Sequence, residues 1–213
     1  MSERGYCSPG MYPDYRRDSA VFGDLPLNSF IYPVANRISI VMAAPGDVYE
    51  RELKYLLSGD QKTIAKMVKT CSDGEKRAYM SIMEEPFVVV RAAGSLGMDL
   101  VALRWDFSFP IEVKSTADGI LHFSRNTRLT EQAEKMKCEC ARSHLLPVYA
   151  FRLKGVRGDP WRVFTIPMEE ELKGNMGFLQ RRVPGMRISP NGNYILKWDE
   201  GMKLSDFLEY LME

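Results

Sequence analysis

Three charged side chains in two neighbouring apolar segments have the types and the spacing of a metal-dependent site for cleaving phosphodiesters. Asp99 opens the segment DLVALRW, and the segment FPIEVK carries Glu112 and Lys114. Residues two apart in a strand share a face, so Glu112 and Lys114 are expected to point to the same side of a sheet. Mg²⁺ prefers oxygen ligands and is usually held by one or two carboxylates together with phosphate oxygens. The pattern predicts that Asp99 and Glu112 bind Mg²⁺ or Mn²⁺.

Lys114 adds a group that carboxylates cannot supply. Lys114 can orient a metal-activated water or, as a neutral amine, deprotonate it, and as an ammonium it can stabilise the charge that grows on the phosphoryl oxygens in the transition state. Asp99 and Glu112 share a face only if the residue numbers of paired positions on the two strands add up to an odd number, as they do when 99 lies opposite 112. Sequence does not determine that register. The alternative is that these residues are ordinary solvated charges at strand ends, a spacing that also arises by chance.

A longer pattern around these residues resembles a known family. The segments RAAGS at 91–95, DLVA at 99–102 and IEVK at 111–114 are similar to those of the archaeal Holliday-junction resolvases of the PD-(D/E)xK nuclease superfamily. The resemblance covers roughly residues 73–166. It implies a restriction-endonuclease-like core, a catalytic set of Asp99, Glu112 and Lys114, branched DNA as substrate, and a homodimer.

The resemblance implies two more catalytic residues, an acid on the helix before the RAAGS strand and a glutamine on the helix after IEVK. Gln132 fits the second position. For the acid, Glu75 stands at the expected distance, whereas Glu50 and Glu52 in YERELKYLL match the family's wording more closely. Either of these would require an insertion of more than twenty residues before the strand, so Glu75 is preferred and the other two remain open.

Four residues are expected to contact DNA. The resemblance implies that Arg91 and Ser95 of RAAGS do so, although Ser95 also suits a plain turn. The net charge of +1 argues against an extended nucleic-acid surface, but residues 121–165 hold nine Lys or Arg against four acids. Arg125 and Arg128 begin the helix nearest to IEVK, so they are expected to bind phosphates. Ordinary solvated helix charges are the alternative.

The order of apolar segments predicts a mixed α/β fold. A helix capped by Ser72 or Asp73 precedes the strands FVVVR, DLVALRW and FPIEVK, and a long helix from about Thr127 to Ser143 precedes PVYAFRL and WRVFTI. The resulting order αβββαβ describes a mixed sheet flanked by helices, which is the core that the nuclease superfamily uses.

Four regions are expected along the chain. Residues 1–41 are predicted to be an irregular, disordered arm with one short strand at RISIVM, and Met42 is an alternative start. Residues 42–72 form a helical extension, and residues 73–166 the nuclease-like core. Residues 167–213 form a small α+β cap that covers a sheet edge, binds substrate or mediates dimerisation. Within it, a hairpin is expected at RISPNGNYILKW and a terminal helix at MKLSDFLEYLME.

Composition narrows the function classes further. A chain of 213 residues with 45% hydrophobic content can bury one solid core, and no run of eighteen apolar residues predicts a membrane span. Its four cysteines are too few for a disulfide framework, which favours a cytoplasmic protein. The sequence therefore predicts a Mg²⁺- or Mn²⁺-dependent endonuclease. A DNA-binding or scaffold protein with little catalysis is the main alternative, and cleavage of RNA or single strands stays open.

Overall fold

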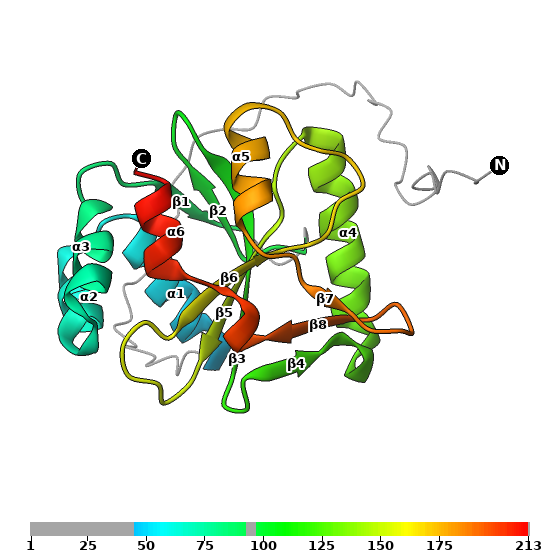
Figure 1. Cartoon of the computed structure of the whole chain (residues 1–213), viewed down its shortest axis with the longest axis horizontal. Helices are drawn as coiled ribbons and strands as arrows, with labels where there is room; N and C mark the ends of the chain where they lie inside the picture. Colours follow the sequence, from blue (N-terminus) through cyan, green and yellow to red (C-terminus); the bar gives the residue numbers. More distant parts are fainter. Residues whose placement is uncertain (1–44, 93–96, 213) are drawn as a thin grey trace, which may run out of the picture. The chain divides into compact units, whose positions relative to one another are not determined.

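The structure, a computed structural model, describes residues 45–92 and 97–212 (Figure 1). Residues 43–213 form one compact unit. The arm expected at residues 1–41, with its RISIVM strand, lies outside the described residues. No helix in the described ranges is long and apolar enough to cross a membrane.

The unit is a mixed α/β fold. Its helices are α1 (Pro45–Leu57), α2 (Gln61–Met67), α3 (Asp73–Ser81), α4 (Thr127–Ser143), α5 (Gly174–Arg182) and α6 (Leu204–Tyr210), with 3-10 turns η1 (Val68–Thr70), η2 (Phe123–Arg125) and η3 (Trp198–Glu200). Its strands are β1 (Val88–Arg91), β2 (Leu100–Leu103), β3 (Ser108–Thr116), β4 (Ile120–His122), β5 (Val148–Leu153), β6 (Trp161–Thr165), β7 (Arg187–Ile188), β8 (Tyr194–Lys197) and β9 (Met202–Lys203). The expected order αβββαβ is present from α3 to β5, with β4 as an extra strand after β3.

Six strands form the main sheet in the order β1-β2-β3-β5-β6-β9. Only β3 and β5 pair in parallel, because α4 lies between them in the chain and carries it back across the sheet. The other neighbours in this sheet are antiparallel. A smaller sheet, β4-β8-β7, contains the expected hairpin, whose turn places Gly192 at a φ of 77°.

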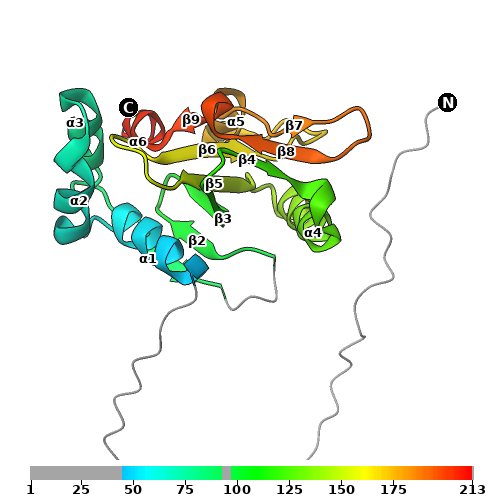
Figure 2. The same ribbon diagram turned by 90° about the horizontal axis from the view of Figure 1, so that it is seen from below.

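Alternating side chains divide the core between the two faces of the main sheet. In β5, Val148 and Ala150 join one apolar cluster, and Tyr149 and Phe151 join the other. Figures 1 and 2 show α1 and α4 on opposite sides of the sheet. On the face of α4, the stripe Ala133, Met136 and Cys140 is buried, as its helical spacing predicts.

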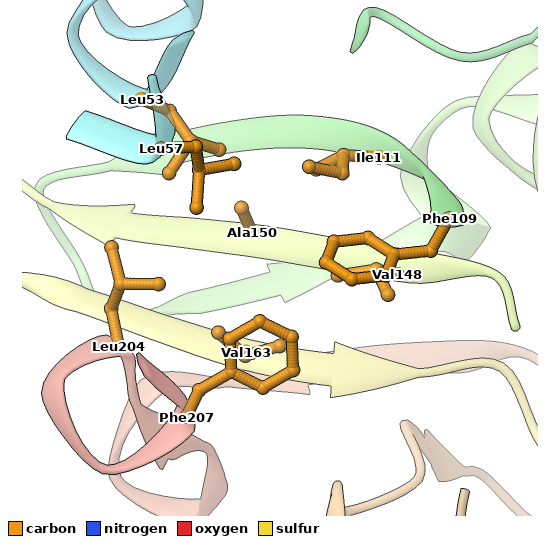
Figure 3. A pocket seen from close by; sticks show the side chains of 9 residues that line it. All are labelled: Leu53, Leu57, Phe109, Ile111, Val148, Ala150, Val163, Leu204 and Phe207. Carbon is orange, nitrogen blue, oxygen red and sulfur yellow. The ribbon is translucent and has the colours of Figure 1, made fainter. Parts of the chain in front are cut away.

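The cluster on the face of α1 joins elements from both ends of the described chain. Figure 3 shows Leu53 and Leu57 of α1 facing Leu204 and Phe207 of α6 across the strands, around an apolar cavity of about 10 Å³. Strand β9 pairs with β6 and so covers an edge of the main sheet. The expected helical extension and C-terminal cap are therefore packed into the same unit as the strands.

A buried carboxylate ties three of these elements together. Asp159 accepts hydrogen bonds from the hydroxyl of Tyr79 (2.8 Å), the backbone N–H of Trp161 (2.9 Å) and the backbone N–H of Ser205 (2.8 Å). Burial raises the pKa of Asp159, and these three donors oppose that rise. The loop before β6 is thereby fixed to α3 and α6.

Candidate active site

The pairing of β2 with β3 brings the two expected metal ligands together. Leu100 lies opposite Ile111, and in every β2–β3 pair the two residue numbers add up to the same odd number. Continuing this register by one residue places Asp99 opposite Glu112, so the condition stated from the sequence is met. The backbone N–H of Val113 donates a 2.8 Å hydrogen bond to the Asp99 carboxylate, which holds it against β3.

Glu112 lies in the middle of the sheet and is only 1% exposed. Its Oε1 accepts a 2.5 Å hydrogen bond from Lys114 Nζ, while its Oε2 is buried and has no hydrogen-bond partner among the described residues. Burial raises the pKa of Glu112 to about 7. The Lys114 ammonium opposes this rise, and the negative charges of Asp99 and Glu50 add to it.

The pKa of Asp99 is shifted in the same direction as that of Glu112. Its pKa is raised chiefly by burial and further by the negative charge of Glu50, whereas the hydrogen bond from Val113, the charge of Lys114 and a hydrogen bond shared with a protonated Glu112 carboxyl lower it. Two carboxylates whose pKa values are both raised at one point favour binding a cation. This is the electrostatic situation that a metal ion relieves.

Gln132 reaches the same place from α4. Its Oε1 lies 3.5 Å from Lys114 Nζ, so the ammonium sits between Glu112 and Gln132. Gly97, in the loop before Asp99, lies beside the Gln132 side chain and adopts a φ of 74°, a backbone conformation that favours glycine. The sequence-predicted set Asp99, Glu112, Lys114 and Gln132 is thus assembled.

Among the acids of the first helix, Glu50 is the one whose charge acts on the predicted metal ligands. Arg91 donates a 2.7 Å hydrogen bond to its carboxylate, and its charge acts on both Asp99 and Glu112. Glu52 belongs to another contact, because it accepts hydrogen bonds from Arg152 (2.8 Å) and from the Trp161 indole (3.0 Å). Glu50 is therefore the candidate of that helix that the structure joins to the site.

The preference for Glu75 requires correction. Glu75 completes a capping box at the start of α3, where its Oε2 accepts a 2.9 Å hydrogen bond from the backbone N–H of Ser72. Its Oε1 forms a 3.0 Å ion pair with Lys203. These contacts occupy Glu75 away from Asp99 and Glu112. Distance along the chain was misleading, because α2 and α3 form the insertion that the spacing argument disfavoured.

Tyr149 is a site residue that the sequence argument missed. It lies directly opposite Glu112 in the parallel pairing of β3 and β5, and its side chain is fully buried. Burial raises its pKa strongly, and the charges of Glu112 and Asp99 raise it further. Only the period-two alternation of PVYAFRL hinted at its orientation, and the register with IEVK depends on tertiary structure.

Three of the four residues expected to contact DNA lie in the described part of the chain. Arg125 in η2 and Arg128 in the first turn of α4 are exposed. Arg128 precedes Gln132 by four residues, so both lie on one face of α4. Arg91 is half exposed and bound to Glu50. Ser95 lies outside the described residues.

The donor set at this site fits a divalent cation that also binds phosphate oxygens. The described residues contain no group of three or more His, Cys, Asp or Glu side chains arranged to hold a metal ion. They do present the carboxylates of Asp99 and Glu112 side by side, with Glu112 Oε2 unpaired. Mg²⁺ commonly takes only one or two protein carboxylates and completes its coordination with water and substrate.

Comparison with solved structures gives a distant likeness. No protein-family model and no curated protein matches this chain. Among solved structures, it is similar to Hjc of Archaeoglobus fulgidus, a Holliday junction resolvase from an archaeal hyperthermophile, with a TM-score of 0.44 and 16% sequence identity. The match covers 78% of this chain and 97% of that chain.

Proposed function

We propose that this chain is a Mg²⁺- or Mn²⁺-dependent endodeoxyribonuclease that cleaves branched DNA. The observation that carries the proposal is the buried Glu112, which lies beside Asp99 and keeps one oxygen unpaired while Lys114 binds the other. Burying a carboxylate is costly unless a cation and hydrogen bonds compensate it. A second carboxylate at the same point increases that cost, and a bound divalent cation removes it.

Each side chain has a role in this proposal. A divalent cation supplies positive charge to the scissile phosphate and lowers the pKa of an attacking water. Asp99 and Glu112 hold it, and the N–H of Val113 keeps the Asp99 carboxylate oriented. Lys114 holds Glu112 and presents its ammonium protons to the negative charge of the transition state, while Gln132 positions the Lys114 amine.

Substrate shape and assembly are proposed from the sequence resemblance to the archaeal resolvases. Arg125 and Arg128 bind phosphates of the DNA backbone beside the site, and Arg91 and Ser95 contact the strand near Asp99. A homodimer suits a branched substrate, because two copies present two sites related by symmetry to two strands.

A cleavage assay tests the proposal. The substrates are a four-way junction, a flap, a duplex and single strands of the same sequences, each with Mg²⁺, Mn²⁺ or EDTA. We expect metal-dependent cleavage of branched DNA by the wild type. Asp99→Ala should abolish cleavage and leave DNA binding in EDTA largely intact, because it removes a metal ligand without removing a phosphate contact.

Glu75 and Glu50 provide the matched comparison. Glu75→Ala removes an acidic side chain outside the cluster, so it should cost about 1 kcal/mol of stability through the lost cap while cleavage per folded molecule stays unchanged. Glu50→Gln should alter the pH dependence of cleavage, because its charge acts on both ligands. DNA binding without cleavage in any metal would favour the non-catalytic alternative, and cleavage by Asp99→Ala would exclude this site.

A further inference from the structure

Two buried polar atoms lie unpaired at one place in the sheet. In the described part of the chain, the buried side-chain oxygens without a hydrogen-bond partner are Glu112 Oε2 and the Tyr149 hydroxyl. The two residues are direct partners on the adjacent strands β3 and β5. Because paired residues on neighbouring strands point to the same side of a sheet, the carboxylate and the phenol share one environment.

Leaving these atoms unpaired is energetically unfavourable. An unsatisfied buried hydroxyl or carboxylate oxygen costs about 1 to 3 kcal/mol or more, and nearly all such groups in native proteins have a partner or an ordered water. The ring of Tyr149 packs in the apolar cluster, 5.9 Å from the ring of Phe123 between centroids. Packing explains the ring, but a phenylalanine would pack as well, so the hydroxyl needs its own explanation.

We infer that Tyr149 is a positioning residue whose hydroxyl donates a hydrogen bond, directly or through one water molecule, to the carboxylate of Glu112 when Glu112 serves as a metal ligand. The inference rests on the metal site of the proposed function. Lys114 holds Oε1, and Tyr149 restrains the carboxylate from the side of Oε2. Each carboxylate oxygen has more than one lone pair, so Oε2 can accept this bond and bind a cation together.

The chemistry of the phenol suits this role. The Tyr149 side chain is fully buried, and burial disfavours the charged phenolate, so the hydroxyl keeps its proton and remains a donor. A donor that orients a ligand without bearing a charge does not compete with the cation for the carboxylate. Partners of this kind that hold the ligands of metal sites change metal affinity about 10- to 100-fold when they are mutated.

A Mn²⁺ titration of the full chain by calorimetry tests the inference, together with melting in EDTA. Tyr149→Phe keeps the ring and removes only the hydroxyl. We expect it to bind Mn²⁺ about 10- to 100-fold more weakly than the wild type. Its melting temperature in EDTA should be unchanged or higher, because the substitution removes an unsatisfied buried group.

Tyr79→Phe is the matched control. The Tyr79 hydroxyl is also buried, but it donates a 2.8 Å hydrogen bond to Asp159 on the other face of the sheet. This variant should melt at a lower temperature and keep the wild-type affinity for Mn²⁺. A lower melting temperature of Tyr149→Phe with unchanged affinity would identify a structural hydroxyl and overturn the inference.

The titration separates the inference from the proposed function. Equal affinities of the wild type and Tyr149→Phe for Mn²⁺ would overturn the role of Tyr149 and leave the proposed nuclease site standing. Failure of the wild type to bind Mn²⁺ would overturn the metal site and this inference together. Because the readout is metal affinity, a protein that binds Mn²⁺ but cleaves no DNA still decides the role of Tyr149.

Discussion

Glu112 shows how a single position joins stability to chemistry. Its place in the centre of the sheet removes water from the carboxylate, and this burial is the main reason that its pKa rises to about 7. Lys114 opposes the rise, so the side chain lies near the boundary between its neutral and charged forms. In the proposed metal site, a proton and a metal cation would therefore compete for the same carboxylate.

This competition predicts a specific pH dependence. Because the pKa of Glu112 is raised from 4.5 to about 7 in the folded chain, the native state retains a proton that the unfolded chain releases. The resulting stability is fully present below pH 4.5 and is lost as pH rises through about 7, a change of about 3 kcal/mol. Urea unfolding in EDTA at pH 5 and pH 8 should show this loss in the wild type and a smaller loss in Glu112→Gln.

The affinity for Mn²⁺ should change in the opposite direction. It should increase as pH rises toward and through 7, because deprotonation of Glu112 frees the ligand. The informative quantity is the difference in pH slope between the wild type and Glu112→Gln, since the other titrating groups are common to both proteins. An identical pH slope in the wild type and Glu112→Gln would show that the environment of Glu112 does not raise its pKa.

Spacing along the chain was sufficient for some residues of the site and not for others. Asp99 and Glu112 could be predicted because they stand on adjacent strands joined by a short connection, where distance in sequence limits distance in space. Glu75 was preferred to Glu50 because the helices between Glu50 and the strand of Arg91 were counted as evidence against Glu50. Tyr149 depends on a parallel register, which is set by the packing of α4 and has no local signal.

Elements with a strong period were predictable, and elements defined by pairing were not. The helix α4 has its apolar residues at helical spacing, and the strands β3 and β5 are rich in β-branched and aromatic residues. The strands β4 and β9 have three and two residues, respectively. Strands this short have no pattern of their own, because a neighbouring strand decides whether they exist.

A further prediction concerns DNA binding by η2 and the first turn of α4. Arg125 and Arg128 are exposed near Gln132, so each should neutralise a phosphate of DNA that lies over the site. Replacing both by Ala should weaken binding to unrelated sequences about equally and reduce the slope of log affinity against log salt by roughly 1 to 2. Fluorescence anisotropy with EDTA present measures both quantities.

Arg142 provides the matched control at the other end of the same helix. It is exposed in the last turn of α4, far along the helix from Gln132. Arg142→Ala should leave the salt slope unchanged. Equal slopes for the wild type and the double variant would mean that Arg125 and Arg128 are solvated charges without a role in binding, and the metal site would be unaffected.

At the scale of the whole molecule, the C-terminal region is part of the main core. The sequence predicted a hairpin and a terminal helix there, and both are present. It predicted neither the pairing of β9 with β6, which lies about 40 residues earlier in the chain, nor the packing of α6 on the face of α1, which lies about 150 residues earlier. Arg104 also holds the C-terminal region in place, since its guanidinium donates a 2.6 Å hydrogen bond to the carbonyl of Leu211.

Removing residues 202–213 should therefore unfold the protein rather than trim a dispensable cap. The deletion removes four buried apolar side chains, namely Leu204, Phe207, Leu208 and Leu211. Burying each contributes roughly 1.5 to 3 kcal/mol, so together they are comparable to the 5 to 15 kcal/mol that stabilise an ordinary domain.

Phe207→Ala, which removes the ring packed 5.7 Å from that of Phe109, should cost about 3 to 5 kcal/mol by itself. Circular dichroism melting measures both variants, and a cooperative transition of the truncated chain near the wild-type temperature would show that the region is an appendage after all.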